Sequence, residues 1–414
     1  MLQLFDLGPD LSKFRIKIIG IGNGGINAIN YMQDKLEGVQ FIAADTDCRK
    51  LAAASTDCRI SLGSKKTRGC GTGGSPQIGM EAAQESETEI RNIIGEETPL
   101  IFIVAGLGGG TGTGASPVVA RIAEEMGALS IAAATLPSQG EGRLCLAVAE
   151  GGVAELRKHA DSLLLFNNNR QAQLSHNNHI LEMLNAPYTH LCRSVCGITD
   201  MVNTVGHVAI DLADMERILR KSGLALMGVG EAGGENRARE AVEQAITCPL
   251  QNDVSIDGAQ RVLYNITISS SAGHAEYYEA SNLIHEKVHP EAVIIPGITF
   301  SEDTPDLFRI TVIATGLNEN TASARHQSPL FKFEPQGAEA RPQSLLPVDR
   351  MPRHGLRRSA LTPQTNERRQ HQGQAQLPVM AAGGSAMSHK PGSTVMTYDK
   401  SNPESPSFMR LLPD

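Results

Sequence analysis

The chain has 414 residues, of which 41% are hydrophobic and 20% charged, and its formal net charge at pH 7 is −8. This length allows two domains of ordinary size with residues to spare. The acidic balance argues against a general nucleic-acid-binding protein, which would usually be basic. Aromatic residues are scarce at 4%, and the 41 glycines favour an α/β protein with glycine-rich loops over an all-β sandwich.

The seven cysteines are scattered along the chain. This distribution indicates reduced thiols in a cytoplasmic protein, and neither a disulfide framework nor a metal site is expected. We expect no signal peptide, because no apolar segment of the required kind precedes the first strand. No apolar stretch reaches membrane-spanning length, so direct insertion into a membrane is not expected either.

After a short leader at 1–14, the first half of the chain alternates strand-like and helix-like patterns. Such alternation predicts a parallel sheet with helices on both faces and a ligand site at the carboxyl ends of the strands. We therefore expect a Rossmann-like α/β domain over residues 15–175. Its predicted strands are 15–21, 41–45, 100–106, 129–136 and 161–166, and its clearest helical patterns are 75–94 and 115–128.

The second half is expected to contain three different kinds of segment. Residues 176–222 read as mainly helical, and a second α/β (α+β) domain would follow over 223–317. Residues 318–400 are rich in Pro, Gln, Ser and Arg, a composition that cannot bury enough surface to fold and predicts a disordered linker. Residues 401–414 regain apolar side chains, either as an incidental remnant or as a docking peptide that folds on a partner.

Three glycine-rich loops connect predicted strands and helices, and we number them as the first at 20–25, the second at 108–114 and the third at 69–79. Glycine lets backbone N–H groups approach phosphate oxygens, and a helix N-terminus adds partial positive charge. The spacing from Gly25 to Asp45 also fits a dinucleotide fingerprint, as in an NAD enzyme. A single pyrophosphate does not need three such loops, whereas an enclosed mononucleotide di- or triphosphate would use them. The chain has no GxxxxGK[ST] motif, so it is not a P-loop protein.

The segment GGGTGTG at 108–114 resembles the signature of the tubulin/FtsZ superfamily. Further segments, including TRGCGTGGSPQIG, GENRAREAVEQAITCPL and RITVIATG, are similar in order and spacing to the FtsZ family of bacterial cell-division proteins. The resemblance covers about residues 13–317. The tail SPSFMR also resembles the C-terminal peptide of that family, whose usual form is close to I-P-x-F-L-R.

The resemblance implies a GTPase domain, a long central helix and a C-terminal activation domain. It also implies head-to-tail protofilaments in which GTP, with Mg²⁺, is hydrolysed to GDP at the junction, where an acidic loop of the next subunit completes the site. A cytoplasmic protein at the midcell division ring would follow. Residues 402–414 would dock a membrane adaptor such as FtsA or another division protein.

The phosphate-binding positions of the family map onto the three glycine loops. Thr72 stands where the family commonly has Ala, so its hydroxyl and methyl could donate to the γ-phosphate or crowd it. The expected nucleotide-binding residues in these loops are Gly22, Asn23, Gly24, Gly25, Ile26, Asn27, Gly71, Thr72, Gly73, Gly108, Gly109, Gly110, Thr111, Gly112 and Thr113.

Two aspartates follow the second predicted strand. Asp47 matches the family acid and is expected in the nucleotide site, while Asp45 stands where Asn is usual. A second carboxylate beside phosphates repels them unless a cation intervenes. The alternative for Asp45 is a strand-end turn in which its side chain accepts backbone hydrogen bonds.

The ribose and base contacts of the family are carried over with several departures. Glu141 aligns with the ribose-binding glutamate, and Asn168 with the family Asn. Cys145 replaces an expected arginine, for which Arg143 could reach across. Leu184 stands where an aromatic ring stacks on guanine, and Tyr188 where Asp or Asn reads the guanine edge, with Thr189 as the alternative. A tyrosine presents no bidentate acceptor, which weakens discrimination against adenine by ~1–3 kcal/mol.

The expected catalytic residues are Asp211 and Asp214, which keep the two acids of the family pattern N-x-D-x-x-D, while Ala209 replaces its amide. They would orient and polarise water at the γ-phosphate of the neighbouring subunit. Considered alone, two acids three apart at a helix start are commonly capping partners. Because the departures cluster in one site, two functions lead: a GTPase that forms filaments, and a filament-forming paralogue with weak or absent hydrolysis. An NAD-dependent dehydrogenase stays as a third alternative.

Overall fold

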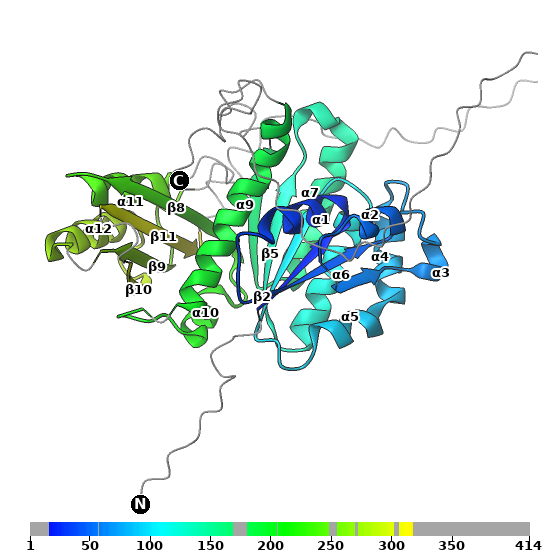
Figure 1. Ribbon diagram of the computed structural model, residues 1–414, viewed down its shortest axis with the longest axis horizontal. Coiled ribbons are helices and arrows are strands. Elements are labelled where there is room, and N and C mark those ends of the chain that lie inside the picture. The colour runs from blue at the N-terminus through cyan, green and yellow to red at the C-terminus, as the bar shows by residue number, and fades with distance from the viewer. Residues whose placement is uncertain are drawn as a thin grey trace, which may run out of the picture. The chain divides into compact units, whose positions relative to one another are not determined.

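The computed structural model describes residues 16–56, 58–168, 180–204, 206–247, 255–269, 272–301 and 306–317. The predicted leader, the linker and the C-terminal peptide lie outside these residues. Two sheets organise the described part of the chain (Figure 1).

The first sheet has seven strands in the order β3-β2-β1-β4-β5-β6-β7, and every pairing is parallel. This order is that of a doubly wound Rossmann-like sheet, which confirms the predicted fold class. The strands are β1 Ile16–Ile21, β2 Val39–Asp45, β3 Cys58–Ser61, β4 Leu100–Gly106, β5 Leu129–Leu136, β6 Ser162–Asn167 and β7 Gly223–Leu224.

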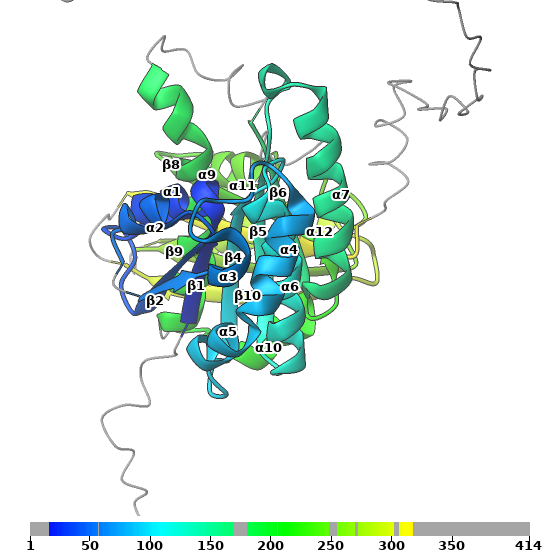
Figure 2. The ribbon, with the colours of Figure 1, turned by 90° about the vertical axis from the view of Figure 1, so that its right-hand side faces the viewer.

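Helices cover both faces of this sheet, and Figure 2 shows the sheet between the two layers. One face packs on α1 and α9, and the other on α4, α5, α6 and α7. The strands are buried on both sides, which is why they read as continuous apolar runs and not as alternating ones. The helices are α1 Gly22–Met32, α2 Cys48–Ala52, α3 Ser64–Thr67, α4 Pro76–Glu85, α5 Glu87–Ile94, α6 Thr111–Glu125, α7 Arg143–His159, α9 Ile180–Asn203 and α10 Leu212–Leu219, with a 3₁₀ turn η1 at Gln139–Glu141.

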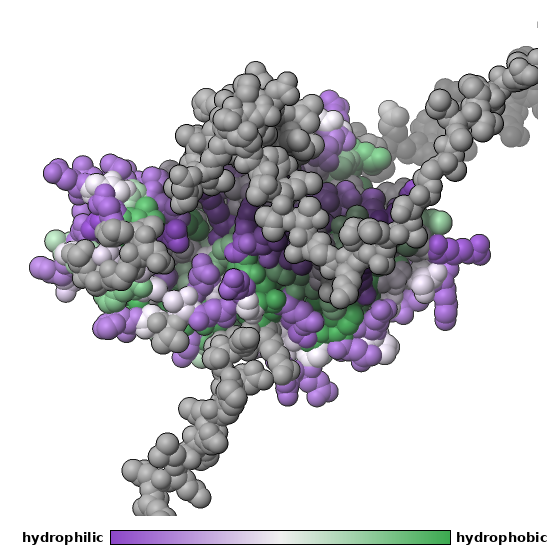
Figure 3. Space-filling view, viewed as in Figure 1, coloured by the Kyte–Doolittle hydropathy of each residue, from purple (hydrophilic) through white to green (hydrophobic). Residues whose placement is uncertain are grey.

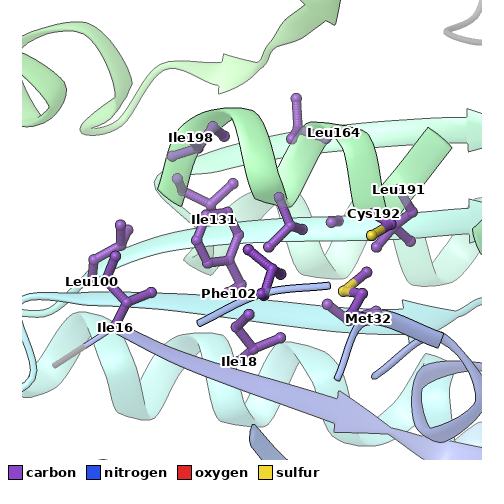
Figure 4. Close-up of a cluster of buried hydrophobic side chains, with 14 of the residues drawn as sticks. Ile16, Ile18, Met32, Leu100, Phe102, Ile131, Leu164, Leu191, Cys192 and Ile198 are labelled. Atoms are coloured by element: carbon purple, nitrogen blue, oxygen red, sulfur yellow. The ribbon is translucent and has the colours of Figure 1, made fainter. Parts of the chain in front are cut away.

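The central helix α9 lies across one face of the sheet. In Figure 4 its Ile198 lies near Ile131 of β5, and its Leu191 and Cys192 lie near Met32 of α1. The same buried cluster continues into the second sheet through Met227, Leu263 and Ile313. One hydrophobic core therefore joins α9 to both sheets.

The second sheet has four strands in the order β10-β9-β11-β8, with β9 and β10 parallel and the other pairings antiparallel. Helix α11 packs closely on β8, because Gly228 and Gly230 face the backbone of Ala241 and Ala245 and leave no room for a Cβ atom. The elements are β8 Leu226–Gly233, α11 Arg237–Ile246, β9 Arg261–Ile268, α12 His274–Lys287, β10 Val293–Phe300 and β11 Leu307–Thr315.

The observed elements differ from the sequence-based description in three respects. The pattern at 75–94 is two helices, which meet at Ser86. The helices after the first and second glycine loops begin inside the glycine runs, at Gly22 and at Thr111. The short strands β3 and β7 were missed because four residues and two residues carry no readable periodicity.

Hydrophilic side chains cover most of the described surface in Figure 3, with smaller apolar areas near β2 and α5. Among the described residues, the structure contains no helix with the length and apolar character needed to span a membrane.

Candidate functional site

The first and second glycine loops meet at the carboxyl ends of β1 and β4. A Cβ atom on Gly22 would lie 2.9 Å from the Gly112 nitrogen, and one on Gly24 would lie 3.0 Å from the Gly106 Cα. Only glycine therefore allows the first turns of α1 and α6 to converge. The unpaired N–H groups of two helix N-termini at one place form an anion-binding site.

The third loop closes against the second. The Gly71 N–H donates to the Thr46 carbonyl at 3.0 Å, and the Thr72 side chain is buried with its hydroxyl against Gly110. Gly73 and Gly74 have positive φ angles of 60° and 83°, and no atom lies within 4 Å of the position of a Cβ on either. The loop thus presents an open glycine edge, and the Thr72 methyl and hydroxyl are taken up by packing.

The tip of the second loop, formed by Gly108 and Gly109 and called the glycine crest below, is also open on one side. No atom lies within 4 Å of a Cβ position on Gly109, whereas neighbouring Gly108 packs against the Cys145 side chain. The Gly108 N–H donates to the Thr113 hydroxyl at 2.9 Å, which fixes the turn. The buried Thr113 hydroxyl therefore shapes the loop from within.

Asp45 accepts two backbone hydrogen bonds through Oδ1, from the N–H groups of Thr46 at 2.6 Å and Asp47 at 3.1 Å. This is the strand-end turn that the sequence analysis gave as the alternative to a role beside a cation. Its Oδ2 is buried and has no hydrogen-bond partner. Burial raises the pKa of this carboxyl above its ordinary value. The sequence reasoning missed Thr46, whose hydroxyl lies 2.7 Å from that of Thr111 and ties the strand end to the second loop.

Asp47 is engaged by its own helix. Its carboxylate caps α2 by accepting the Arg49 N–H at 3.0 Å and pairs with the Arg49 guanidinium at 3.0 Å. The hydrogen bonds from the Arg49 side chain hold the pKa of Asp47 below its ordinary value. Asp47 lines a cavity of about 300 Å³ together with Asn23, Ile26 and Asn27, so the structure brings these four expected residues together.

The segment expected to reach the ribose lies beside the second loop. The Glu141 carboxylate accepts the Ser138 N–H at 2.7 Å in a capping box, and Arg143 begins α7 with an exposed side chain. Cys145 is half-buried against Gly108, and burial followed by the charge of Glu141 raises the pKa of its thiol. Glu141 and Cys145 therefore lie close to one another and to the glycine crest.

The expected base pocket is only partly described. Asn168, directly after β6, has a buried Oδ1 with no hydrogen-bond partner. Tyr188 is half-buried against the core, and the Thr189 hydroxyl is 2.9 Å from the Tyr31 hydroxyl. Leu184 belongs to α9, but its side chain lies outside the described residues. Asn168 therefore offers an unpaired acceptor, whereas the Thr189 hydroxyl already has a partner.

Asp211 and Asp214 form a reciprocal capping box at the start of α10. The Asp211 carboxylate accepts the Asp214 N–H at 2.8 Å, and the Asp214 carboxylate accepts the Asp211 N–H at 3.2 Å. This is the capping alternative of the sequence analysis. Both carboxylates remain accessible to solvent, and so does Ala209.

This acidic turn is not brought to the glycine loops. The chain that follows α10 lies at the amino ends of the strands, where the Ser222 N–H donates to the Asp161 carbonyl just before β6. Between the two places runs α9, whose 24 residues span about 36 Å. The expected binding residues and the expected catalytic residues are thus at opposite ends of the same helix.

Comparisons with known proteins agree with this geometry. The model of the Tubulin/FtsZ family GTPase domain matches residues 15–176, and that of the FtsZ family C-terminal domain matches residues 223–318. The chain is 38% identical over 322 residues to the cell division protein FtsZ of Coxiella burnetii, covering 77% of this chain and 83% of that protein.

Solved structures are similar as well. A dimer of FtsZ from M. jannaschii matches with a TM-score of 0.67 and 35% identity, over 73% of this chain and 88% of that one. CetZ2 of Haloferax volcanii, in a protofilament with GTPγS bound, matches with a TM-score of 0.64 over 75% of this chain and 96% of that one. Its 20% identity shows a common fold.

Proposed function

This chain belongs to the FtsZ family of cell-division proteins and carries the GTPase domain of the tubulin/FtsZ superfamily, and from that premise we propose that it polymerises head to tail and hydrolyses GTP at each junction. GTP would bind at the carboxyl ends of β1 and β4, and Asp211 and Asp214 of the next subunit would complete the hydrolytic site. The product would be GDP and phosphate.

This proposal rests mainly on the separation of two half-sites. One is the set of glycine loops, which would bind GTP, and the other is the acidic turn that contains Asp211 and Asp214. One molecule cannot place its own acidic turn at its own glycine loops, because α9, which is about 36 Å long, runs between them. Two molecules stacked in the same orientation would bring one half-site onto the other. Such a heterologous contact does not close on itself, so it generates an open filament.

Exposed apolar side chains lie beside both half-sites and support the same head-to-tail contact between subunits. Val208 and Phe300 are each 44% exposed beside the acidic turn, where Val208 forms a β-bridge to the same strand as Phe300. Leu144 is 80% exposed in the first turn of α7, next to the glycine crest. Large exposed apolar groups are poor surface residues and are commonly part of contacts between proteins.

In hydrolysis the glycine loops would hold the phosphates through backbone N–H groups and the N-termini of α1 and α6. Asp211 uses Oδ1 and Asp214 uses Oδ2 in the capping box. The second oxygen of each carboxylate can accept a hydrogen bond from water and orient it toward the phosphate of the neighbour. The cap itself would keep the two carboxylates in register.

The described residues contain no group of three or more His, Cys, Asp or Glu side chains placed to hold a metal ion. They do not form a preformed Mg²⁺ cage, and we derive no step through the ion. Mg²⁺ that accompanies GTP would be bound mainly by phosphate oxygens and water, as is common for this ion.

A second candidate function is a nucleotide-bound filament with weak hydrolysis. Cys145 occupies the position of the expected arginine and packs on Gly108, so it supplies no positive charge near the phosphates. Ala209 likewise supplies no amide in the acidic turn. Phosphate release that rises steeply with protein concentration would favour the GTPase, whereas nucleotide-bound filaments without turnover would favour the scaffold.

Mixing two inactive variants tests whether GTP is hydrolysed at a site shared by two neighbouring subunits. Gly109→Asp places a carboxylate in open space at the glycine crest, so it should fold and lose nucleotide binding. Asp214→Ala should bind nucleotide and hydrolyse slowly. In an equimolar mixture roughly a quarter of junctions would combine an intact pocket with an intact acidic turn, and phosphate release should recover to that fraction.

The matched control is Gly151→Asp, because a Cβ at Gly151 in α7 is also in open space. This variant should bind nucleotide and assemble normally. A mixture of the two inactive variants that stays inactive, although Asp214→Ala still binds GTP, would contradict hydrolysis at a shared junction.

We further propose that residues 402–414 dock a membrane adaptor such as FtsA, and that the protein acts in the cytoplasm at the midcell ring. The support is the family membership and the apolar residues of that peptide, which lies outside the described residues.

A further inference from the structure

We propose that Asp45 is a proton-linked nucleotide-binding residue, whose Oδ2 takes up a proton when a nucleoside triphosphate binds and donates it in a hydrogen bond to a phosphate oxygen. This inference rests on the function proposed above. It assigns to Asp45 a role different from both the turn and the cation site considered from the sequence.

The geometry of Asp45 leaves one oxygen without a partner. The residue is 2% exposed, and its Oδ1 accepts the backbone N–H groups of Thr46 and Asp47. Its Oδ2 is buried and has no hydrogen-bond partner in the described structure. Buried polar atoms are nearly always paired, so an orphaned carboxylate oxygen indicates a partner that arrives with a ligand.

Asp45 itself lies near the junction of the glycine loops. Pairing of β1 with β2 sets Ile21 opposite Ala44, so Asp45 comes beside Gly22 at the start of α1. The Thr46 hydroxyl is 3.4 Å from Asp45 Oδ1 and 2.7 Å from the Thr111 hydroxyl at the start of α6. Asp45 thus stands where the two helix N-termini would receive phosphates.

A proton on Asp45 explains its unpartnered Oδ2 better than a bound metal cation does. A bridging cation needs several oxygen ligands, but both oxygens of neighbouring Asp47 are engaged by Arg49, and no cluster of three acidic or metal-binding side chains exists among the described residues. An ionised Asp45 would repel the phosphates. A protonated Asp45 has the shape of asparagine, with Oδ1 as acceptor and Oδ2–H as donor, and attracts them.

The surroundings of Asp45 fix the direction of the pH dependence. Burial is the largest influence and raises its pKa, the Asp47 charge adds to this, and the two backbone hydrogen bonds and Lys50 in α2 oppose it. The ends of α1 and α6 nearest to it present Gly22 and Thr111, which have no ionisable side chains, and the partial positive charge of these helix N-termini opposes the rise in pKa. Bound phosphate, being anionic, raises the pKa further. Affinity is therefore full below the pKa of Asp45 in the free protein, falls as pH rises from that pKa to the higher pKa of the complex, and stays low above it.

Calorimetry of the full chain with a slowly hydrolysed GTP analogue tests the proposal, using Asp45→Asn for comparison. Asparagine keeps the acceptor and has a permanent donor. The Kd of the wild type should rise by up to about tenfold per pH unit more than that of Asp45→Asn. Titrations in two buffers of different ionisation enthalpy should show uptake of about one additional proton by the wild type.

The analogue's own phosphate ionisation is common to both proteins and cancels in the comparison. Asp34→Asn, which removes an exposed carboxylate and the same charge, should follow the wild type. Parallel pH profiles and equal proton uptake in wild type and Asp45→Asn would overturn the proposal. So would a difference that depends on Mg²⁺ and not on pH, because that indicates a cation. Absence of binding in both proteins would instead contradict the proposed function.

Discussion

At the scale of single residues, Asp211 and Asp214 hold the start of α10 before they can act on any neighbour. Each carboxylate satisfies the backbone N–H of the other residue, at 2.8 Å and 3.2 Å. A side-chain cap of this kind stabilises a helix by about 0.5–2 kcal/mol. Replacing either acid with alanine therefore changes both the fold of the turn and the chemistry offered to the next subunit.

Asp214→Asn separates these two roles. Its amide oxygen can still accept the Asp211 N–H, so we expect unfolding in urea and nucleotide binding close to those of the wild type. Its lost charge should slow phosphate release strongly, by about 10²-fold or more if it positions the attacking water. Asp214→Ala should show the same loss of turnover together with lower stability. Unchanged turnover in Asp214→Asn would count against a catalytic carboxylate.

Individual residues also show which features could not be predicted from the sequence. The turn at Asp45 was one of two alternatives, because a strand-end aspartate commonly accepts backbone N–H groups. Its orphaned second oxygen depends on how closely β1, α1 and α6 pack, which one segment of sequence does not express. The Tyr31–Thr189 hydrogen bond joins residues 158 apart, so no local pattern could reveal that Thr189 is already engaged.

At the scale of elements, long apolar strands were predicted almost to the residue, and β4 and β5 match their expected ranges. Helix starts were not, because glycine disfavours helices in isolation. In the fold, Gly22 and Gly112 are required for the close approach of α1 and α6, and the packing of the helices outweighs that local preference. The element boundaries that matter most for binding were thus the hardest to predict.

One buried side chain joins three elements at the amino ends of the strands. Asp161 is 3% exposed and accepts the Ser130 N–H at 2.9 Å, the Ser130 hydroxyl at 3.1 Å and the Lys221 N–H at 3.3 Å. It therefore links β5, β6 and the turn between α10 and β7. Removing it would leave buried donors unsatisfied, which costs more than the hydrogen bonds contribute.

We expect Asp161→Ala to lower the free energy of unfolding by roughly 3 kcal/mol, seen as a lower midpoint of urea denaturation. The control is Asp306→Ala, which removes a carboxylate that is 83% exposed and paired with Arg237 at 3.3 Å. An exposed pair of this kind contributes less than about 1 kcal/mol. Equal effects of the two substitutions would contradict a structural role for the buried carboxylate.

At the scale of the whole molecule, the parallel first sheet followed from the order of the segments, because β–α alternation leaves few ways to build such a sheet. What the order of segments could not supply was the distance between the half-sites. That distance comes from an uninterrupted α9, which contains Pro187 and still runs from Ile180 to Asn203. Because of the length of this helix, one copy of the chain needs a second copy to complete the proposed hydrolytic site.

The C-terminal peptide gives the last prediction. Residues 402–414 contain Phe408, Met409, Leu411 and Leu412 after a long polar segment, a pattern typical of a peptide that folds on a partner. Deleting them should leave the concentration dependence of GTP hydrolysis unchanged, because both proposed half-sites lie in the described domains. Binding to a purified adaptor such as FtsA, measured by calorimetry, should be abolished.

Phe408→Ser in the full-length chain is the sharper form of the same test, since it keeps the length and charge of the tail. Burying a phenylalanine side chain on a partner contributes about 1.5–3 kcal/mol, so its loss should weaken adaptor binding by roughly 10- to 100-fold. Val395→Ser, an apolar change within the polar segment, should bind the adaptor like the wild type. Equal adaptor affinity with and without residues 402–414 would place the docking surface on the folded domains instead.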